Sequence, residues 1–514
     1  MQRKQLTLVI VSLLVVVLSV SLAWFTTQII GKGKNLNVSS ANLQIVFTDS
    51  DGALTETDIE PGWSATKTFT IKNDTKTEYK YNIVIKDLVN TFVTNGYLQY
   101  KITSTNNGYN MTEFKDIPKS SAPKDTILAY SVVIPNGVTQ SYTIEFKYAN
   151  DESVDQSDDM GKKLSGTLFI TEGTEPTLLT QLLADKSTVL TRTDFSTVLT
   201  NDNTNTLYTS TEDSKTVYYF AGNATDNWVK FGKNASNQDL YWRIIRTNSE
   251  GSIRLLYHGT STTATDAYIG KSAFNETYDD PMYVGYMYGT SGSLVNNRTN
   301  TTNSTIKGVI DTWYKNNLNT NYGKYISTTA VYCNDRSNPA GGYNTGKTSF
   351  NYGARTRLDT YKTPTYDCTD TNDKFTVDTS TGNGKLTYPI ALMTADEVSF
   401  AGGLYANYNA NAWYFRNAKE GTLTTSSSST DASYSSTGST YWWLLSPFYW
   451  FGSSARASVF YVGGSSLPGF LGDYFVDGTR GVRPAVSLKS CVKTSGGDGS
   501  AGTPYTIEES TSGC

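Results

Sequence analysis

Histidine is nearly absent from this sequence. His258 is the only one among 514 residues, so a metal site with two histidine ligands is excluded, and a Cys-His pair could use that residue alone. Basic residues are not in excess either, since 43 Lys and Arg stand against 47 Asp and Glu, for a net charge of -4. A nucleic-acid partner is therefore not expected, because such proteins carry a basic patch. We predict no metal, no cofactor and no enzymatic activity.

Cysteine is also scarce. Only four cysteines occur, and no two of them form a C-x2-C pair, which disfavours a metal cluster. Cys333 and Cys368 bracket one loop-rich segment, and Cys491 and Cys514 bracket the tail. Three connectivities are possible, of which we expect the sequential one. Disulfides of this kind fit an exported protein.

One long apolar run stands near the start of the sequence. From Leu6 to about Phe25 the residues are uncharged and strongly apolar, behind a basic start. About 20 apolar residues span a bilayer, so residues 1–31 are predicted to be a signal peptide or an N-terminal membrane anchor. We favour cleavage near Ala23 and keep an uncleaved transmembrane segment as the alternative. Both predict a secreted or cell-surface protein.

Residues 37–173 show the alternation of half-buried strands. Apolar residues recur at every second position in several short runs, and turn signals such as Asp51-Gly52 and Pro61-Gly62 separate these runs. Seven or so short strands with this punctuation favour an all-β sandwich, which would act as a stalk or assembly module. Residues 174–206 are more polar and are interpreted as a linker, in which four leucines between Leu178 and Leu183 predict a short helix.

Residues 207–514 mix many short strands with few helices, which predicts an α+β domain. Apolar residues at i, i+3, i+4 and i+7 predict a helix from Ser304 to about Leu318. Thr394 and Glu397 have the form of a capping box, which predicts a second, short helix. The chain is therefore expected to be multidomain, with a sandwich followed by an α+β domain.

The stretch from Tyr441 to Leu488 is the most unusual in the chain. Its flanks are apolar and typical of scaffold, but residues 448–478 mix large aromatic side chains with Gly, Ser and Pro, and no period persists. This mixture is typical of binding surfaces, because Tyr and Trp give stiff contact area while Ser and Gly adapt. We expect loops that present the rings. The residues expected to point inward between them are Ala455, Ala457, Val459, Val462 and Val476.

Two interpretations of these aromatic residues are therefore open. In the first they contact a ligand, and in the second they are ordinary core of a β-rich domain, since aromatic residues dominate cores as well as interfaces. The first is preferred, because Pro and Gly leave few uninterrupted strands to carry the rings inward. The candidate ligand-binding residues are Phe448, Tyr449, Trp450, Phe451, Ser453, Ser454, Arg456, Ser458, Phe460, Tyr461, Ser465, Phe470, Leu471, Asp473 and Tyr474.

The first third of the chain resembles a known group of proteins. The apolar leader ending LAWFTT, the segment LQIVFTD and the segment PGWSATKTFTIKN are similar to the secreted β-sandwich proteins of the camelysin and TasA-like biofilm-fibre group. This resemblance implies a surface-exposed module that can polymerise.

A second resemblance covers about residues 207 to 507. The segments YWRIIRTNSEGSIRLLYHG, IDTWYKNNL, VYCNDRS, LTYPIALMTADEVSFAGG, YWWLLSP and GVRPAVSLK occur in the order seen in a domain of bacterial surface proteins. That domain is similar to the C-type-lectin fold in its formylglycine-generating-enzyme variant, which implies a C-type-lectin-like domain for residues 207–514. In this fold group, diversity-generating retroelements often rewrite the C-terminal segment, which then forms a variable ligand-binding surface.

The composition of residues 448–478 is compatible with such rewriting. Replacing adenines in the first two positions of Asn codons never yields Lys, Glu, Gln, Met or Trp, and the segment contains none of the first four. Trp450 is the exception, so it needs a different template codon or belongs to the scaffold. The fold resemblance implies neither catalysis nor Ca²⁺-dependent sugar binding, because the cysteines stand in segments typical of structure and the tripeptides Glu-Pro-Asn and Gln-Pro-Asp do not occur.

The sequence thus predicts a bacterial surface receptor or adhesin that binds an unknown protein or cell-surface ligand through a variable aromatic surface. The alternative is a structural fibre or matrix subunit in which the aromatic stretch is an assembly interface. A formylglycine-type oxidase is the third and least favoured reading.

Overall fold

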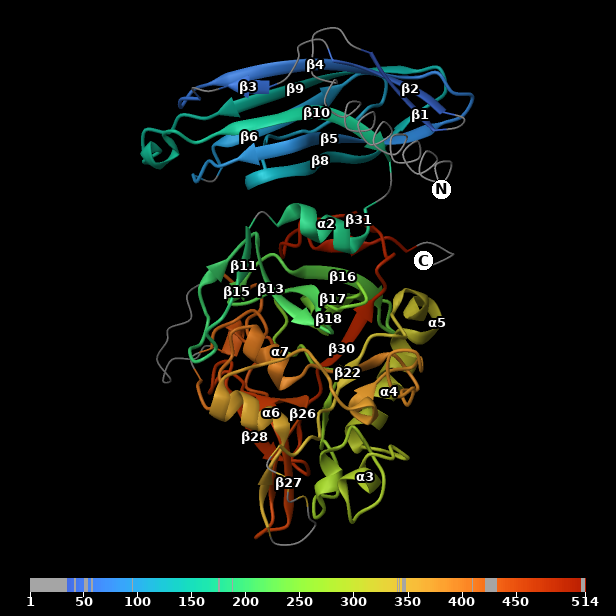
Figure 1. Ribbon diagram of the computed structural model, residues 1–514, viewed down its shortest axis with the longest axis vertical. Helices are drawn as coiled ribbons and strands as arrows, with labels where there is room; N and C mark the ends of the chain where they lie inside the picture. Colours follow the sequence, from blue (N-terminus) through green and yellow to red (C-terminus); the bar gives the residue numbers. More distant parts are fainter. Residues whose placement is uncertain are drawn as a thin grey trace, which may run out of the picture. The chain divides into compact units, whose positions relative to one another are not determined.

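The computed structural model divides the chain into two compact units, the second of which begins at Pro176 (Figure 1). The described residues are 35–40, 43–49, 54–56, 59–94, 96–173, 176–186, 188–339, 341, 343, 348–408, 410–420, 432–509 and 514. The predicted signal peptide or anchor at residues 1–31 lies outside them. Among the described residues, no helix is both long enough and apolar enough to span a membrane.

The first unit consists of two antiparallel sheets. One sheet has the order β1 (Asn35–Ser40), β2 (Leu43–Asp49), β4 (Ser64–Asn73), β9 (Thr139–Tyr148), β6 (Leu98–Ser104) and β7 (Lys115–Asp116). The other has the order β3 (Leu54–Glu56), β10 (Leu164–Glu172), β5 (Tyr79–Asn90) and β8 (Ser120–Ile134). A short 3-10 helix, η1 (Ser157–Asp159), precedes β10.

One core lies between these two sheets, as the alternation in the sequence predicts. Phe69 and Ile71 of β4 and Ile144 of β9 belong to the same buried cluster as Ile83 of β5 and Ile170 of β10. The strands β4, β6 and β9 bury every second residue, because successive side chains of a strand point to opposite faces. The first unit is therefore a β-sandwich.

The second unit begins at Pro176, so most of the predicted linker is part of it. The helix α2 (Leu178–Asp185) forms where the leucines predict it, with Leu178 and Leu182 buried in the large core of this unit. The strand β11 (Thr188–Thr191) follows and pairs with β13 (Thr206–Glu212). The linker interpretation is wrong for these residues, because long-range pairing and apolar burial hold a segment that looks polar in sequence.

Two larger sheets make up most of this unit (Figure 1). The strands of the ten-stranded sheet are β11, β13, β14 (Lys215–Tyr219), β17 (Asp239–Thr247), β16 (Trp228–Lys233), β32 (Tyr505–Ile507) and β31 (Thr494–Gly496), with β18 (Ile253–Tyr257), β30 (Pro484–Leu488) and β25 (Ile390–Leu392) joined through β17. The six-stranded sheet comprises β19 (Lys271–Ser272), β29 (Arg480–Gly481), β26 (Trp442–Phe451), β27 (Arg456–Val462), β28 (Leu471–Phe475) and β23 (Phe350–Asn351).

Short pairs and helices complete the second unit. The two-stranded sheets are β12 (Asp202–Asn203) with β15 (Asn223–Ala224), β20 (Met287–Tyr288) with β21 (Thr302–Asn303), and β22 (Tyr332–Cys333) with β24 (Lys374–Phe375). The remaining helices are η2 (Pro281–Val284), α3 (Leu294–Asn297), α4 (Thr305–Asn317), α5 (Asn319–Tyr322), η3 (Gly323–Tyr325), α6 (Gly353–Arg355), η4 (Thr356–Tyr361), η5 (Thr371–Asp373), α7 (Ala395–Phe400) and η6 (Ala432–Tyr434). Among the described helices of this unit, only α2 and α4 are longer than six residues, so the sheets form its frame.

The local helix signals in the sequence are confirmed. The hydroxyl of Ser304 caps α4 by accepting a hydrogen bond from the backbone N–H of Lys307. Both bonds of the capping box form at α7. The side chain of Thr394 accepts a hydrogen bond from the backbone N–H of Glu397, and the side chain of Glu397 accepts one from the backbone N–H of Thr394. The sequential disulfides also form, Cys333 with Cys368 and Cys491 with Cys514.

A buried ion network joins α7 to the ten-stranded sheet. The carboxylate of Glu397 accepts hydrogen bonds from Arg246 of β17 at 3.0 Å and from Arg254 of β18 at 2.8 Å, and Arg246 also pairs with Glu212 at 2.8 Å. Burial alone would raise the pKa of Glu397, but Arg254 and Arg246 hold this pKa below its ordinary value. The stabilisation by Glu397 is therefore present above its unfolded-state pKa and is lost as the pH falls through its folded-state pKa.

Removing this carboxylate tests the importance of the network. Glu397→Gln leaves two buried arginines without their shared anion, so we expect the free energy of unfolding of the second unit to fall by about 3 to 5 kcal/mol. Urea unfolding followed by Trp fluorescence measures the change. Asp239→Asn is the control, because Asp239 is 39% exposed in its pairs with Lys230 and Lys233, and exposed pairs contribute about 0 to 1 kcal/mol. Equal losses in the two variants would contradict the expectation.

Candidate ligand-binding surface

The aromatic stretch forms strands rather than loops. The strands β26, β27 and β28 pair in an antiparallel meander, with Trp450 opposite Ala457 and Ser458 opposite Phe475. Pro447 lies inside β26, where the register with β27 shifts on both of its sides. These irregularities accommodate a residue that has no N–H to donate, as is usual for proline within sheets. The expectation that loops carry the rings is therefore wrong.

The strands divide the candidate residues by burial. The buried ones are Phe448, Trp450, Ser458, Phe460, Tyr461, Ser465 and Leu471. The half-buried or exposed ones are Tyr449, Phe451, Ser453, Ser454, Arg456, Phe470, Asp473 and Tyr474. For the first group the core interpretation of the sequence holds, and these side chains offer little or no surface to a ligand.

The expected inward residues are mostly confirmed. Ala457, Val459, Val462 and Val476 are fully buried. Ala455 is instead exposed, in the turn between β26 and β27, and its φ of 49° places it in the left-handed region. The turn explains the difference, because it takes Ala455 out of the strand alternation that buries its neighbours.

One face of the meander carries a set of half-buried side chains that we name the aromatic face. Its members are Tyr449, Phe451, Arg456, Asp473 and Phe475. The register brings them together, since Tyr449 lies opposite Ser458 and Ser458 lies opposite Phe475, while Phe451 lies opposite Arg456. The ring of Phe451 is 4.5 Å from that of Tyr449 and 5.3 Å from that of Phe475, both edge to face.

Two arginines lie against these rings. The guanidinium of Arg355, at the end of α6, is 4.3 Å from the centroid of Tyr449, and that of Arg456 is 4.3 Å from the centroid of Phe475. Arg456 also pairs with Asp477 at 2.9 Å. Among the described residues the Nε of Arg355 is buried and has no hydrogen-bond partner. Cations on aromatic rings hold the side chains in fixed positions, so the face presents a preorganised mixture of apolar and charged groups.

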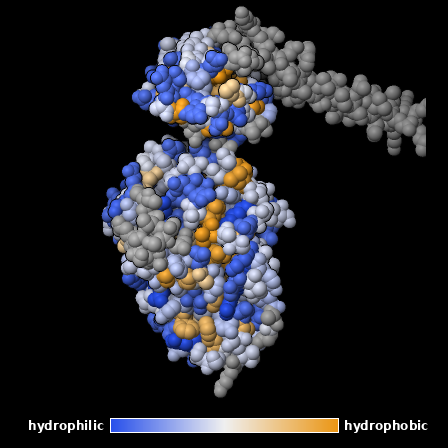
Figure 2. Space-filling model, turned by 90° about the vertical axis from the view of Figure 1, so that its left-hand side faces the viewer, coloured by the Kyte–Doolittle hydropathy of each residue, from blue (hydrophilic) through white to orange (hydrophobic). Residues whose placement is uncertain are grey.

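The opposite face of the meander carries a second cluster at the same edge. Tyr474 is 43% exposed, and the guanidinium of Arg480 is 4.0 Å from its ring. Tyr441 and Tyr461 stack with parallel rings at 5.3 Å. An open hollow of about 300 Å³ adjoins them, lined by Lys271, Ser439, Thr440, Tyr441, Ser466, Thr479 and Arg480. Figure 2 shows small apolar patches amid hydrophilic surface near the end of the unit that carries β27.

Several of these side chains carry no signal of their role in the sequence. Arg355 comes from a helix far along the chain, and Tyr441 and Arg480 stand in flanks that are typical of scaffold. Phe475 is aromatic but follows the last predicted candidate. Only the strand pairing, which places residues distant in sequence side by side, brings these groups to the candidate residues.

Asp473 is the acid of the aromatic face. It lies opposite Phe460 in the register and is half-buried. Burial raises the pKa of Asp473 to about 6, although hydrogen bonds from Ser458 and Tyr405 and the charge of Arg355 act in the other direction. The charge of the face therefore changes near pH 6.

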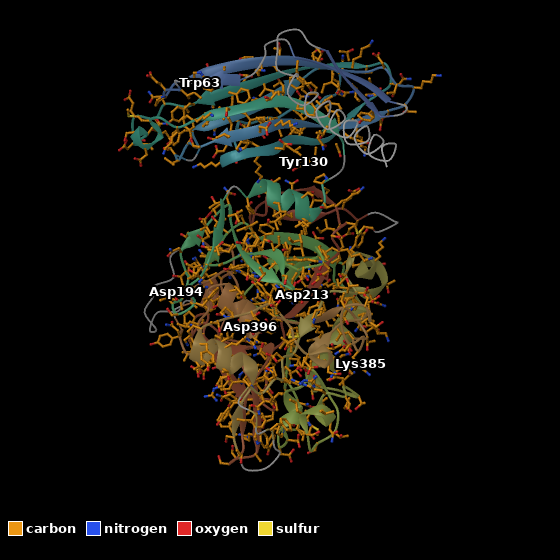
Figure 3. All side chains as sticks on the ribbon, viewed as in Figure 1. Trp63, Tyr130, Asp194, Asp213, Lys385 and Asp396 are labelled. Atoms are coloured by element: carbon orange, nitrogen blue, oxygen red, sulfur yellow. A yellow bond between two sulfur atoms is a disulfide. The ribbon has the colours of Figure 1, made fainter. Side chains whose placement is uncertain are left out.

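A second cluster of charges lies inside the unit and is structural. Arg357 donates hydrogen bonds to Asp396 at 2.9 Å and to Asp335 at 2.6 Å, and Asp396, labelled in Figure 3, lies within the body of the unit. These groups adjoin Glu397 around a cavity of about 20 Å³, which has room for about one water molecule. No group of three His, Cys, Asp or Glu side chains placed to hold a metal ion occurs in the described part of the chain.

One comparison with known proteins gives a match, and it covers the part of the chain that contains the meander. Residues 363–490 match a family model described as a domain of unknown function, DUF6273. The matched segment contains α7 and all three strands of the meander. Neither the curated proteins nor the solved structures gave a match.

The raised pKa of Asp473 predicts a pH dependence of stability. Between about pH 4, where an unfolded Asp loses its proton, and about pH 6, the folded chain holds more protons than the unfolded one. The free energy of unfolding should therefore fall as the pH rises through this window, and Asp473→Asn should remove this part of the slope. Denaturant unfolding at several pH values measures it.

The control for this pH experiment is Ser454→Asn, which adds the same amide in the exposed turn and leaves the carboxyl in place. This variant should keep the slope of the unchanged protein. Identical slopes in the unchanged protein and in Asp473→Asn would show that Asp473 titrates normally.

Proposed function

We propose that this chain is a bacterial cell-surface receptor or adhesin that binds a protein or cell-surface ligand through the aromatic face and the adjoining cluster at Tyr474. One observation carries this proposal: half-buried rings and arginines are held together on a rigid strand meander at the surface. Interfaces owe most of their binding energy to Tyr, Trp and Arg side chains in such settings. The face combines apolar area, two cations and one acid, so it can match a ligand in shape and in charge.

We further propose that the second unit has a C-type-lectin-like fold and that residues 448–478 are a retroelement-diversified segment. The outward residues Tyr449, Phe451, Arg456 and Asp473 are all obtainable from altered Asn codons. Trp450, which is not obtainable in this way, is fully buried and fits the scaffold. Diversification of such a segment alters the surface without altering the core. The sandwich would then be a stalk resembling the camelysin and TasA-like proteins.

The disulfides and the leader of the chain support an extracellular location. Two disulfides and a basic, apolar leader are expected of an exported chain. We propose secretion, with the leader either cleaved or kept as a membrane anchor. A matrix subunit is the alternative function, in which the aromatic surface would contact other copies of the chain.

Removing the outward rings tests the binding proposal. The triple variant Tyr449→Ser, Phe451→Ser, Tyr474→Ser should lose binding at least tenfold, because each ring is accessible to a ligand. Stability should fall by no more than about 2 kcal/mol, whereas Phe460→Ser, at a buried ring, should cost about 3 to 5 kcal/mol. The probes are a printed glycan array and a panel of purified cell-surface proteins.

The control for the binding experiment is Val189→Ser with Leu190→Ser, which removes exposed apolar side chains from β11. These residues lie at the far end of the unit from β27 (Figure 1). The double variant should bind as the unchanged protein does. Binding that survives the triple variant, or no binding by the unchanged protein at micromolar concentration, would contradict the proposal.

The oligomeric state separates the two functions. As a receptor, the purified extracellular chain should sediment as a monomer at micromolar concentration. A matrix subunit should form filaments, and the triple variant should then abolish them. Analytical ultracentrifugation and negative-stain electron microscopy distinguish these outcomes.

A further inference from the structure

One buried ion pair fastens the beginning of the second unit to its main sheet. Lys186 directly follows α2, and Asp226 lies between β15 and β16. The Nζ atom of Lys186 is 2.6 Å from the Oδ2 atom of Asp226 and 3.0 Å from its backbone oxygen. The lysine side chain is 0% exposed and the aspartate side chain 7%. The two reactive groups are thus held in contact and away from water.

Aromatic rings lie near this pair, and one of its carboxylate oxygens lacks a hydrogen-bond partner among the described residues. Nζ lies 5.8 Å from the ring of Phe220 and 5.6 Å from that of Tyr505, so aromatic side chains form part of the enclosure. Oδ2 of Asp226 accepts a further hydrogen bond from the backbone N–H of Asn205 at 2.7 Å. Oδ1 is buried and lacks a partner in the described residues. Burying two charges is costly unless further hydrogen bonds satisfy them.

Burial also affects a neighbouring acid, Asp185. Asp185 accepts hydrogen bonds from Gln181 and from the hydroxyl of Tyr505, the latter at 2.9 Å. Burial raises the pKa of Asp185 even though Gln181, Tyr505 and Lys186 all favour its charged form. Burial at this corner of the unit therefore disfavours the charged form of Asp185.

We propose that Lys186 and Asp226 condense to an isopeptide bond after the chain has folded. A proton passes from the Lys186 ammonium to the Asp226 carboxylate that it contacts, and the amine then attacks Cγ. A C–N bond forms, a C–O bond breaks, and one water molecule leaves with the hydroxyl and a proton of the amine. No oxidant or cofactor is consumed. Fixed contact between a desolvated amine and a carboxyl favours such a step, because orientation replaces a bimolecular encounter.

The bond would join segments that the fold already brings together. It would close a loop of 40 residues between the end of α2 and the strand β16. In the proposed surface protein, force on the stalk enters the second unit through this same segment. A covalent bond there would keep α2 on the sheet under load, a role that two ordinary ionic groups fill less well.

A second buried pair gives an internal comparison. Lys307 and Asp311 lie one turn apart on α4, with Nζ and Oδ2 at 2.6 Å. Oδ1 of Asp311 is buried without a partner in the described residues, like that of Asp226. Asp311 is however 14% exposed, twice as much as Asp226, and the pair has the spacing of ordinary helix ion pairs. We expect this pair to stay ionic.

Peptide mapping of the full, folded chain tests the proposal. After reduction and alkylation, trypsin should not cut after Lys186, and the peptides of Lys186 and Asp226 should appear joined, lighter than their sum by one water molecule. Cleavage after Lys307 should be normal in the same digest. Separate, unmodified peptides for Lys186 and Asp226 from protein with native near-ultraviolet circular dichroism would overturn the proposal.

Three variants identify the side chains that form the proposed bond. Lys186→Arg keeps the positive charge but removes the reactive amine, so it should yield separate peptides, and Asp226→Ala should do the same. Asp226→Asn should still give a joined peptide of the same mass as the unchanged protein, because loss of ammonia from an amide leaves the identical product. A joined peptide in Lys186→Arg would place the link at other residues and refute the assignment. The result is independent of ligand binding, so failure of this proposal would leave the proposed function standing.

Discussion

The burial pattern of the strand meander, which leaves only certain side chains half-buried, is the constraint on which the candidate surface depends. At its end β26 alternates, with Phe448 and Trp450 buried and Tyr449 and Phe451 half-buried, whereas β27 is buried at every position after Arg456. Trp450 and Phe460 anchor the strands by burial, and Tyr449, Phe451 and Arg456 are left at the surface by the same geometry. Because a shift of one residue at the end of β26 would exchange Trp450 with its half-buried neighbours, this buried ring fixes which side chains of the strand a ligand can reach.

Buried charge holds the frame behind this surface. Glu397 joins a short helix to two strands through Arg246 and Arg254, and the helix is itself held by its capping box. Such a network stabilises little in comparison with an apolar core, but breaking it leaves charges without partners. It therefore fixes one arrangement of α7 against the sheet, and the strand β26, which packs near this helix, inherits that arrangement.

The sequence predicted those features whose signals are local. The Ser304 cap, the apolar spacing of α4 and the alternation of the sandwich strands each act within a few residues. The meander was missed because Pro447 and the surrounding Gly and Ser look like strand breakers, whereas bulges accommodate the proline. About half of the candidate residues are buried, since composition alone cannot tell an inward ring from an outward one. Arg355 and the anchoring of Lys186 depend on tertiary contacts that no local pattern contains.

The same geometry explains how such a surface could change its specificity. An outward residue such as Phe451 touches other outward groups, so its replacement disturbs few buried contacts. Surface substitutions usually change stability by less than about 0.5 kcal/mol, whereas buried rings cost several times more. Ligand contacts can therefore vary at the outward positions while Trp450, Phe460 and Val459 keep the strands in register. Stability and recognition are divided between buried and half-buried residues of the same strands, which lets one change without the other.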